Sequence, residues 1–285
     1  MRRGRNSGAF FTAPILITGV ILTAVAVLTF FAPVFAPMDP NRVALSESLE
    51  PPSLRHLLGT DQTGRDIFSR LLYGGRTAVQ NAVMVVGISI AAGIPIGLAC
   101  GYYGGLLDAL VMRCWDILLA FPSLLLGFLF VSAFGRGSVA TVLALGIIYI
   151  PMISKLSRSL AMTEKSKVYV ESAKSLGYSD FRIIFRHILP NCLATLLAEL
   201  TLDVGYAIIG LASLSFLGLG VQPPTSDWGT MLQEGVALLR QNPLMSLSPG
   251  FAIVLTVISL NVFSDGIQAY LDIDQRKLPR FEACE

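Results

Sequence analysis

The sequence predicts an all-α integral membrane protein with six transmembrane helices, and this prediction rests on two observations. Hydrophobic residues make up 53% of the 285 residues and charged residues only 14%, whereas a typical soluble domain has about 25% charged residues. In addition, six windows of 18 to 33 residues contain no Asp, Glu, Lys or Arg. A helix of about 20 apolar residues crosses the hydrocarbon of a bilayer. The windows are residues 6–38, 77–107, 117–135, 137–154, 204–226 and 241–264.

The same composition excludes several other classes of protein. A disordered chain needs low hydrophobicity and high net charge, but the net charge here is +2, which also gives no reason to expect a nucleic-acid partner. The cysteines show no C-x-x-C spacing, so they indicate neither a disulfide framework nor a zinc site. They are Cys100, Cys114, Cys192 and Cys284.

The first expected span follows three arginines near the N-terminus, as a signal peptide does. Its apolar run is longer than the hydrophobic region of a signal peptide, and it ends in Pro33 and Pro37 rather than at a small-residue cleavage site. We therefore interpret it as an uncleaved span. Pro122 is expected to kink the third span. The expected span cores are residues 12–34, 80–103, 113–134, 138–157, 194–218 and 249–271.

The distribution of Lys and Arg predicts the orientation of these spans. With the N-terminus in the cytoplasm, 14 of the 21 cations fall in inside segments and 7 in outside segments, which fits the positive-inside rule. We therefore expect both termini to be cytoplasmic. The expected divisions are a cytoplasmic N-terminus at 1–11, a first transmembrane helix at 12–36, an outer loop at 37–78, a five-helix core at 79–272 and a cytoplasmic tail at 273–285.

Two of the polar segments are expected to contain helices. In the outer loop, Ile67, Phe68, Leu71 and Leu72 recur at helical spacing, which predicts a short amphipathic helix leading into the second span. Either Asp61 or Thr63 is expected to cap it.

The inner loop, residues 155–193, contains seven cations and three acids. It is expected to form a helix over 169–176, with Gly177 as the C-cap. A second helix over 180–188 is expected to end at Pro190. Together they predict a compact hairpin at the membrane surface.

The sequence contains no motif that points to catalysis. It has no G-K-[ST] phosphate loop, no H-E-x-x-H and no G-x-S-x-G, and its histidines, His56 and His187, fall on opposite sides of the membrane. Acids inside the expected spans are candidates for function. We weigh three roles for them, namely helix-to-helix hydrogen bonding, lining of a polar transport path, and, least favoured, catalysis. The acids are Asp116, Glu199, Asp203 and Asp265, and the candidate pathway residues are Glu199, Asp203 and Tyr206.

The inner loop resembles the EAA signature of permease subunits from ABC importers. That signature reads E-A-A, three residues, Gly, and then an I-x-L-P-like ending. Ser172 replaces the middle alanine, a small-for-small change. The matching positions are Glu171, Ser172, Ala173, Gly177, His187, Leu189 and Pro190.

Three further stretches are similar to the dipeptide/oligopeptide/nickel group of these permeases, and specifically to the C-type member of a permease pair. They are residues 58–70, 214–229 and 261–271, and the likeness extends from about residue 10 to residue 275, whereas the C-terminal tail departs from the family ending. The outer-loop signature comprises Gly59, Thr60, Asp61, Gly64, Arg65, Asp66 and Arg70.

The resemblance implies a type I ABC importer permease in a bacterial or archaeal plasma membrane, surrounded by lipid. It implies a second, non-identical permease subunit, two ATPase subunits that bind ATP and Mg, an extracytoplasmic binding protein, and no cofactor in this chain. The inner-loop hairpin would be the coupling helix that docks on an ATPase. The implied cargo is a small peptide. Nickel or a metal chelate is the alternative, although no expected span contains a histidine, and an intramembrane enzyme is a remote one.

Overall fold

The computed structural model describes residues 13–276, and apart from one isolated β-bridge its regular structure in that range is helical. This confirms the all-α prediction. The long helices are α1 (Ala13–Phe30), α3 (Ile67–Tyr103), α6 (Ser138–Lys165), α9 (Leu189–Phe216) and α11 (Leu244–Arg276). The shorter ones are α2 (Ala32–Phe35), a 3₁₀ turn (Leu45–Glu47), α4 (Gly105–Leu119), α5 (Ser123–Phe134), α7 (Val168–Ser175), α8 (Asp180–Ile183), a π-helical turn (Ile184–Ile188) and α10 (Trp228–Val236).

Five helices are long and apolar enough to span a membrane, or six if the bent pair α4–α5 forms one span. The two members of that pair meet at 94°, a far sharper change of direction than the kink expected at Pro122. Pro122 itself is extended, with ψ 126°. A proline disfavours helical geometry in the residue before it and has no N–H to continue the helix. The expected N-terminal segment 1–11 and most of the expected tail 273–285 lie outside the described residues.

The expected cap of the outer-loop helix was wrong. The helix begins at Ile67 and continues without a break to Tyr103, so the amphipathic turn and the second span form one 37-residue helix. Asp66, rather than Asp61 or Thr63, is its N-cap, and its carboxylate accepts the backbone N–H of Ser69 at 2.7 Å. The carboxylate of Asp61 is engaged with two arginines instead.

The sequence predicted that the second hairpin helix ends at Pro190, but it continues past this residue. Instead α8, the π-helical turn and α9 run on as one helical segment from Asp180 to Phe216. Pro190 is the second residue of α9, just past the π-helical turn and Leu189. A proline lacks an N–H and its ring crowds the carbonyl one turn earlier, and the wider π-helical turn accommodates both effects.

Helices α3 and α6 share the most extensive helix–helix interface, and glycines bring their backbones into contact. A Cβ atom on Gly97 would lie 2.2 Å from the carbonyl oxygen of Ser154, and one on Gly101 would lie 2.5 Å from that of Arg158. Small residues allow such close approach between helices where the surroundings are apolar. Any larger side chain at either position would force α3 and α6 apart.

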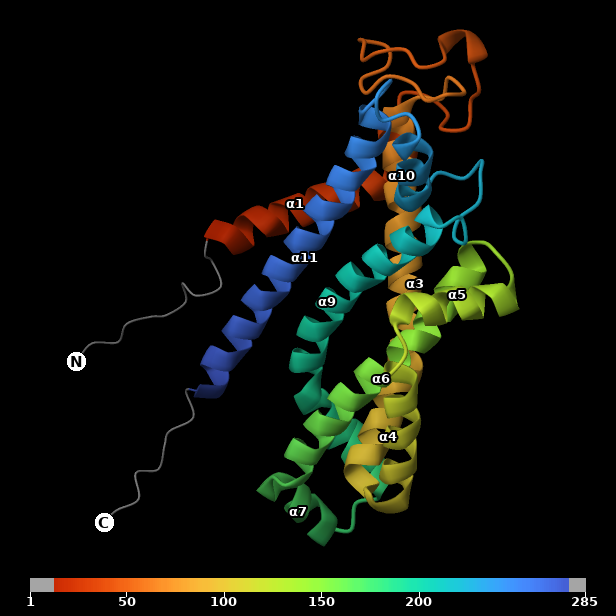
Figure 1. The fold of residues 1–285 in the computed structure, drawn as a ribbon. Helices are drawn as coiled ribbons and strands as arrows, with labels where there is room; N and C mark the ends of the chain where they lie inside the picture. The colour runs from red at the N-terminus through yellow and green to blue at the C-terminus, as the bar shows by residue number, and fades with distance from the viewer. Residues whose placement is uncertain (1–12, 277–285) are drawn as a thin grey trace, which may run out of the picture.

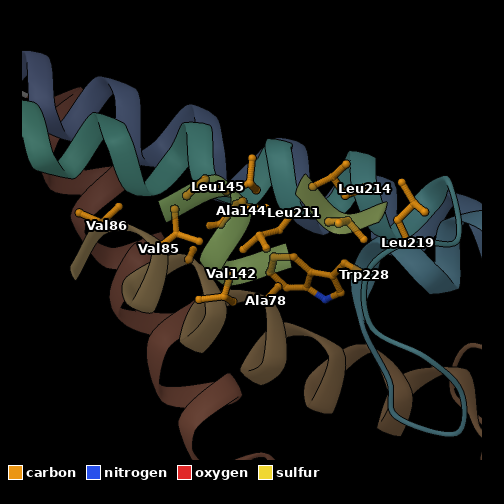
Figure 2. Packing of buried hydrophobic residues seen from close by; sticks show 14 of the residues in the cluster. Ala78, Val85, Val86, Val142, Ala144, Leu145, Leu211, Leu214, Leu219 and Trp228 are labelled. Carbon is orange, nitrogen blue, oxygen red and sulfur yellow. The ribbon is translucent and has the colours of Figure 1, made fainter. Parts of the chain in front are cut away.

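A buried apolar cluster joins α3 and α6 to α9 and α10 (Figure 2). Val85 of α3, Leu145 of α6 and Leu211 of α9 point toward one another in it. Trp228, the first residue of α10, inserts beside them, and its indole N–H donates to the carbonyl of Leu71 at 3.0 Å. Buried indoles need such a partner. This contact fixes α10 against the start of α3.

The loop between α2 and α3, residues 36–66, is held by an ion-pair network centred on Asp61. This carboxylate is 2% exposed and accepts from Thr63 and from the backbone N–H of Arg65 at 3.0 Å. It also pairs with Arg65 Nε at 2.6 Å and with Arg70 Nη1 at 2.5 Å. Arg70 extends the network to Glu234 of α10, at 2.8 Å. The network therefore ties the loop to the starts of both α3 and α10.

The remaining members of the outer-loop signature lie in the same structure, so the fold brings all seven together. Gly64 has φ +76°, and a Cβ there would meet the carbonyl oxygen of Ala44 at 1.8 Å. The carbonyl of Thr60 accepts from Asn242 at 3.0 Å. These members are Gly59, Thr60, Gly64 and Asp66, in addition to Asp61, Arg65 and Arg70.

Competing effects set the pKa of Asp61. Burial by itself raises the pKa, but the hydrogen bonds from Thr63 and the backbone of Arg65, with the charges of Arg70 and Arg65, bring it below its ordinary value. A carboxyl whose pKa is lower in the folded state stabilises that state above its unfolded pKa of about 4. This stabilisation is lost as the pH falls through the lowered, folded-state pKa.

Removing the charge of Asp61 is predicted to open the loop. In Asp61→Asn two buried arginines lose their main partner, and breaking a buried ion pair costs about 3–5 kcal/mol. The amides of Ala44, Leu49 and Thr60, which bond across the loop, should exchange hydrogen at least about 100-fold faster, because each 1.4 kcal/mol is a factor of about ten. Hydrogen-exchange mass spectrometry of the purified complex measures this.

The matched control is Arg55→Gln, which removes an ion pair between Glu47 and an arginine that is 56% exposed. Exposed pairs contribute about 0–1 kcal/mol, so exchange of the same amides should change by no more than about fivefold. Equal exchange in Asp61→Asn and Arg55→Gln would contradict the structural role given to the network.

Candidate functional site

The inner-loop signature forms a compact hairpin of α7 and α8 at the end of the molecule opposite the α2–α3 loop (Figure 1). Its turn has the geometry expected of a glycine C-cap. Gly177 has φ +78°, its N–H donates to the carbonyl of Lys174 at 2.9 Å, and the N–H of Tyr178 donates to the carbonyl of Ala173 at 3.2 Å. This pair of bonds is a Schellman motif, in which glycine is favoured because its φ is positive. The predicted cap at Gly177 is confirmed.

The hairpin packs on the ends of the long helices through an apolar cluster. Val170 and Ala173 of α7 and Ile183 of α8 are buried in it. They meet Leu98 of α3 and Ala161 of α6, both of which are fully buried. The hairpin is thus a continuation of the helix bundle and shares a buried apolar cluster with it.

Hydrogen bonds reinforce this attachment. Tyr102, near the end of α3, donates to the carboxylate of Asp180 at 2.6 Å. Buried Glu164, at the end of α6, accepts from the Tyr169 hydroxyl at 2.7 Å and from Lys167 Nζ at 2.6 Å. Burial, followed by this bond to Glu164, raises the pKa of Tyr169 to about 12, so the hydroxyl keeps its proton and remains a donor.

The outer face of the hairpin exposes large apolar side chains. Val168, Leu176 and Phe181 are 76%, 72% and 70% exposed. Glu171 and Gly177 are also exposed there, and a Cβ on Gly177 would meet nothing within 4 Å. Exposed apolar groups gathered at one end of a protein mark an interaction surface. Val168, Leu176 and Phe181 are not among the matching positions of the EAA signature.

The other members of the inner-loop signature are divided between the inside and the outside of the hairpin. Ser172 is exposed and Ala173 is buried against the bundle. His187 stacks on Tyr178 with ring centroids 5.8 Å apart. Leu189 is half-buried and Pro190 is exposed, and both belong to the first turn of α9. The signature therefore combines packing positions with surface positions.

The candidate pathway residues Glu199, Asp203 and Tyr206 lie on one stripe of α9 and line a pocket of about 490 Å³. Its walls come from α4, α5, α6 and α9, and apart from these three residues and Tyr149 they are mostly apolar. Asp116 and Asp265 do not join them, because Asp116 pairs with Lys155 at 2.5 Å and Asp265 is exposed on α11. Within residues 13–276, no three His, Cys, Asp or Glu side chains are placed to hold a metal ion.

Comparison with known proteins places this architecture among transporter subunits. A family model described as the binding-protein-dependent transport system inner membrane component matches residues 93–277. The dipeptide transport system permease protein DppC of Haemophilus influenzae is 39% identical, over 90% of this chain and 89% of its own length. The probable D,D-dipeptide transport system permease protein DdpC of Escherichia coli K12 is 38% identical, over 91% and 88%. The glutathione transport system permease protein GsiD of Escherichia coli O6:K15:H31 is 40% identical, over 95% and 88%.

These matches cover most of the chain, including the hairpin and the pocket-lining stripe of α9. A membrane component of this kind is a multi-pass inner-membrane permease that is not itself catalytic, because ATP is bound by partner ATPase subunits. Its system also includes a binding protein and a paired permease. The chain belongs to the family of binding-protein-dependent transport system inner membrane components, as an ABC importer permease.

Proposed function

We propose that this chain and a second, non-identical permease form the pathway of an importer for small peptides, either dipeptides or a glutathione-like peptide. The observation that supports this most directly is the set of relatives at 38–40% identity, which are named for dipeptide, D,D-dipeptide and glutathione transport. None of these three is named for nickel, so we favour a peptide over the metal alternative. The pocket beside Asp203 is proposed as part of the pathway.

We further propose that both termini and the α7–α8 hairpin face the cytoplasm. The excess of Lys and Arg in the expected inside segments supports this orientation. The α2–α3 loop and the hairpin lie at opposite ends of the long helices (Figure 1). An inward-facing hairpin therefore requires an outward-facing loop, where a binding protein would dock.

Cysteine labelling tests the orientation. In a background without the native cysteines, Ser46→Cys, Thr225→Cys and Ser166→Cys each introduce a thiol at an exposed position. An impermeant maleimide added to intact cells stripped of any outer membrane should label the first two and leave Ser166→Cys unlabelled until the membrane is permeabilised. Labelling of Ser166→Cys alone in intact cells would reverse the orientation.

We propose that the hairpin is the element that couples this chain to an ATPase. Its inner face is fixed to α3, α6 and α9, and its outer face presents Leu176 and Phe181. Such a hairpin can dock in a groove of the ATPase and transmit movement of that subunit to the membrane helices as a rigid body. An unattached loop would absorb the movement instead.

A charged side chain at the tip of the hairpin is predicted to disrupt coupling. Gly177→Asp costs on the order of 1 kcal/mol in the backbone, because φ is positive, and it places a charge on the proposed contact. Uptake should fall at least about tenfold, and the ATPase subunits should no longer co-purify with the two permeases. Pull-down on a tagged permease, alongside peptide uptake, measures both effects.

Gly135→Asp provides the matched control. Gly135 also has a positive φ, +96°, and open space around it, but it lies between α5 and α6 and outside the hairpin. Its variant should keep its ATPases. Normal uptake by Gly177→Asp with its ATPases firmly attached would remove the hairpin from the coupling mechanism.

A further inference from the structure

Asp203 is a buried carboxylate in the pocket wall that has no partner within residues 13–276. Its side chain is on the pocket-lining stripe of α9, and the residue is only 6% exposed. Among the residues that the structure describes, no side chain or backbone N–H donates to it and no cation pairs with it. A charge removed from water without a partner is costly, and a cationic or donor group that came to Asp203 would offset this cost.

The pocket does not supply that group from its own walls. Its lining contains no Lys, Arg or His. Lys155, three residues after the pocket-lining Met152 on α6, is paired with Asp116 at 2.5 Å. Glu199, one turn before Asp203, accepts from Gln268 of α11 at 3.3 Å. Among the described residues, Asp203 therefore differs from Asp116 and Glu199 in having no internal partner.

The remaining polar groups of the pocket suit a small cation. Tyr149 of α6 and Tyr206 of α9 line the same space as Asp203. A primary ammonium has three donors, which can be shared between a carboxylate and hydroxyl oxygens. Aromatic rings also attract an ammonium through their faces. The surrounding leucines, isoleucines and Met152 are apolar, and apolar surroundings strengthen the electrostatic attraction.

We infer that Asp203 receives the free primary ammonium of the transported peptide, with Tyr149 and Tyr206 beside it. This inference rests on the proposed peptide-import function. Dipeptides, D,D-dipeptides and glutathione differ in length and stereochemistry, but each has one free α-ammonium. A site that binds this shared ammonium accepts all three kinds of peptide. The apolar walls tolerate variation in the side chains of those peptides.

The experiment uses the complete transporter, with both permeases, both ATPases and the binding protein, in liposomes. Alanyl-alanine is the probe, because its α-ammonium is its only cationic group. Asp203→Asn removes the charge at nearly constant shape, Asp203→Glu restores it, and Asp116→Asn is the matched control, at an acid of α4 that does not line the pocket. Peptide uptake, ATP hydrolysis stimulated by the loaded binding protein, and co-purification of the two permeases are measured for each.

In Asp203→Asn we expect at least a tenfold fall in peptides taken up per ATP hydrolysed, with stimulated hydrolysis within twofold of the unaltered complex. Asp203→Glu should recover at least half of the uptake, and Asp116→Asn should lose less than threefold. Uptake by Asp203→Asn at the unaltered rate would overturn the inference. So would loss of the second permease from that variant, since Asp203 would then pair with a cation of that subunit. Failure of the unaltered complex to import alanyl-alanine would instead reject the proposed function.

Discussion

Direct backbone contact between α3 and α6 is the constraint on which the rest of this structure depends. The contact is possible only because Gly97 and Gly101 have no side chain where Ser154 and Arg158 approach. In a membrane, apolar burial does little to drive helices together, so close packing of small residues has to hold them. The contact lies in the half of α3 that leads to the hairpin, and it brings the ends of both helices to one place.

The hairpin and the pocket both follow from that arrangement. Tyr102 at the end of α3 and Glu164 at the end of α6 hold the two sides of the hairpin, while Val170 and Ala173 bury its inner face. The same helix α6 contributes Tyr149 to the pocket that α9 lines with Asp203. A movement imposed on the hairpin is therefore applied to helices that also form the proposed pathway. This is the route that we propose from ATP hydrolysis in a partner to displacement of a substrate.

The sequence predicted the features that depend on composition and on local backbone geometry. Charge-free windows located the apolar helices, and Gly177 indicated the turn between α7 and α8 because a positive φ favours glycine. It did not predict the 94° break at α4–α5, since a proline shows where a helix is interrupted but not how far it turns. It also did not predict that α8 continues into α9, because a π-helical turn before Pro190 has no sequence signature. Asp61 was misread as a cap because its partners include Arg70 and, through that arginine, Glu234, which is distant in sequence.

The central claim is that the hairpin moves as one body with α6, and a distance measurement tests it most directly. Val139, at the start of α6, and Ser175, at the end of α7, are both exposed. The distance between spin labels at these two positions can be measured by pulsed electron paramagnetic resonance. From position 139 to its end, α6 rises over about 26 residues at about 1.5 Å each. This alone places the labels on the order of 40 Å apart. In the assembled transporter, we predict the same distance distribution without nucleotide and with ADP and vanadate trapped in the ATPases, while the distance from Ser175 to a label in the hairpin of the second permease changes. A shift of several ångströms between the labels at positions 139 and 175 would show that the hairpin moves independently of α6, which would contradict the account.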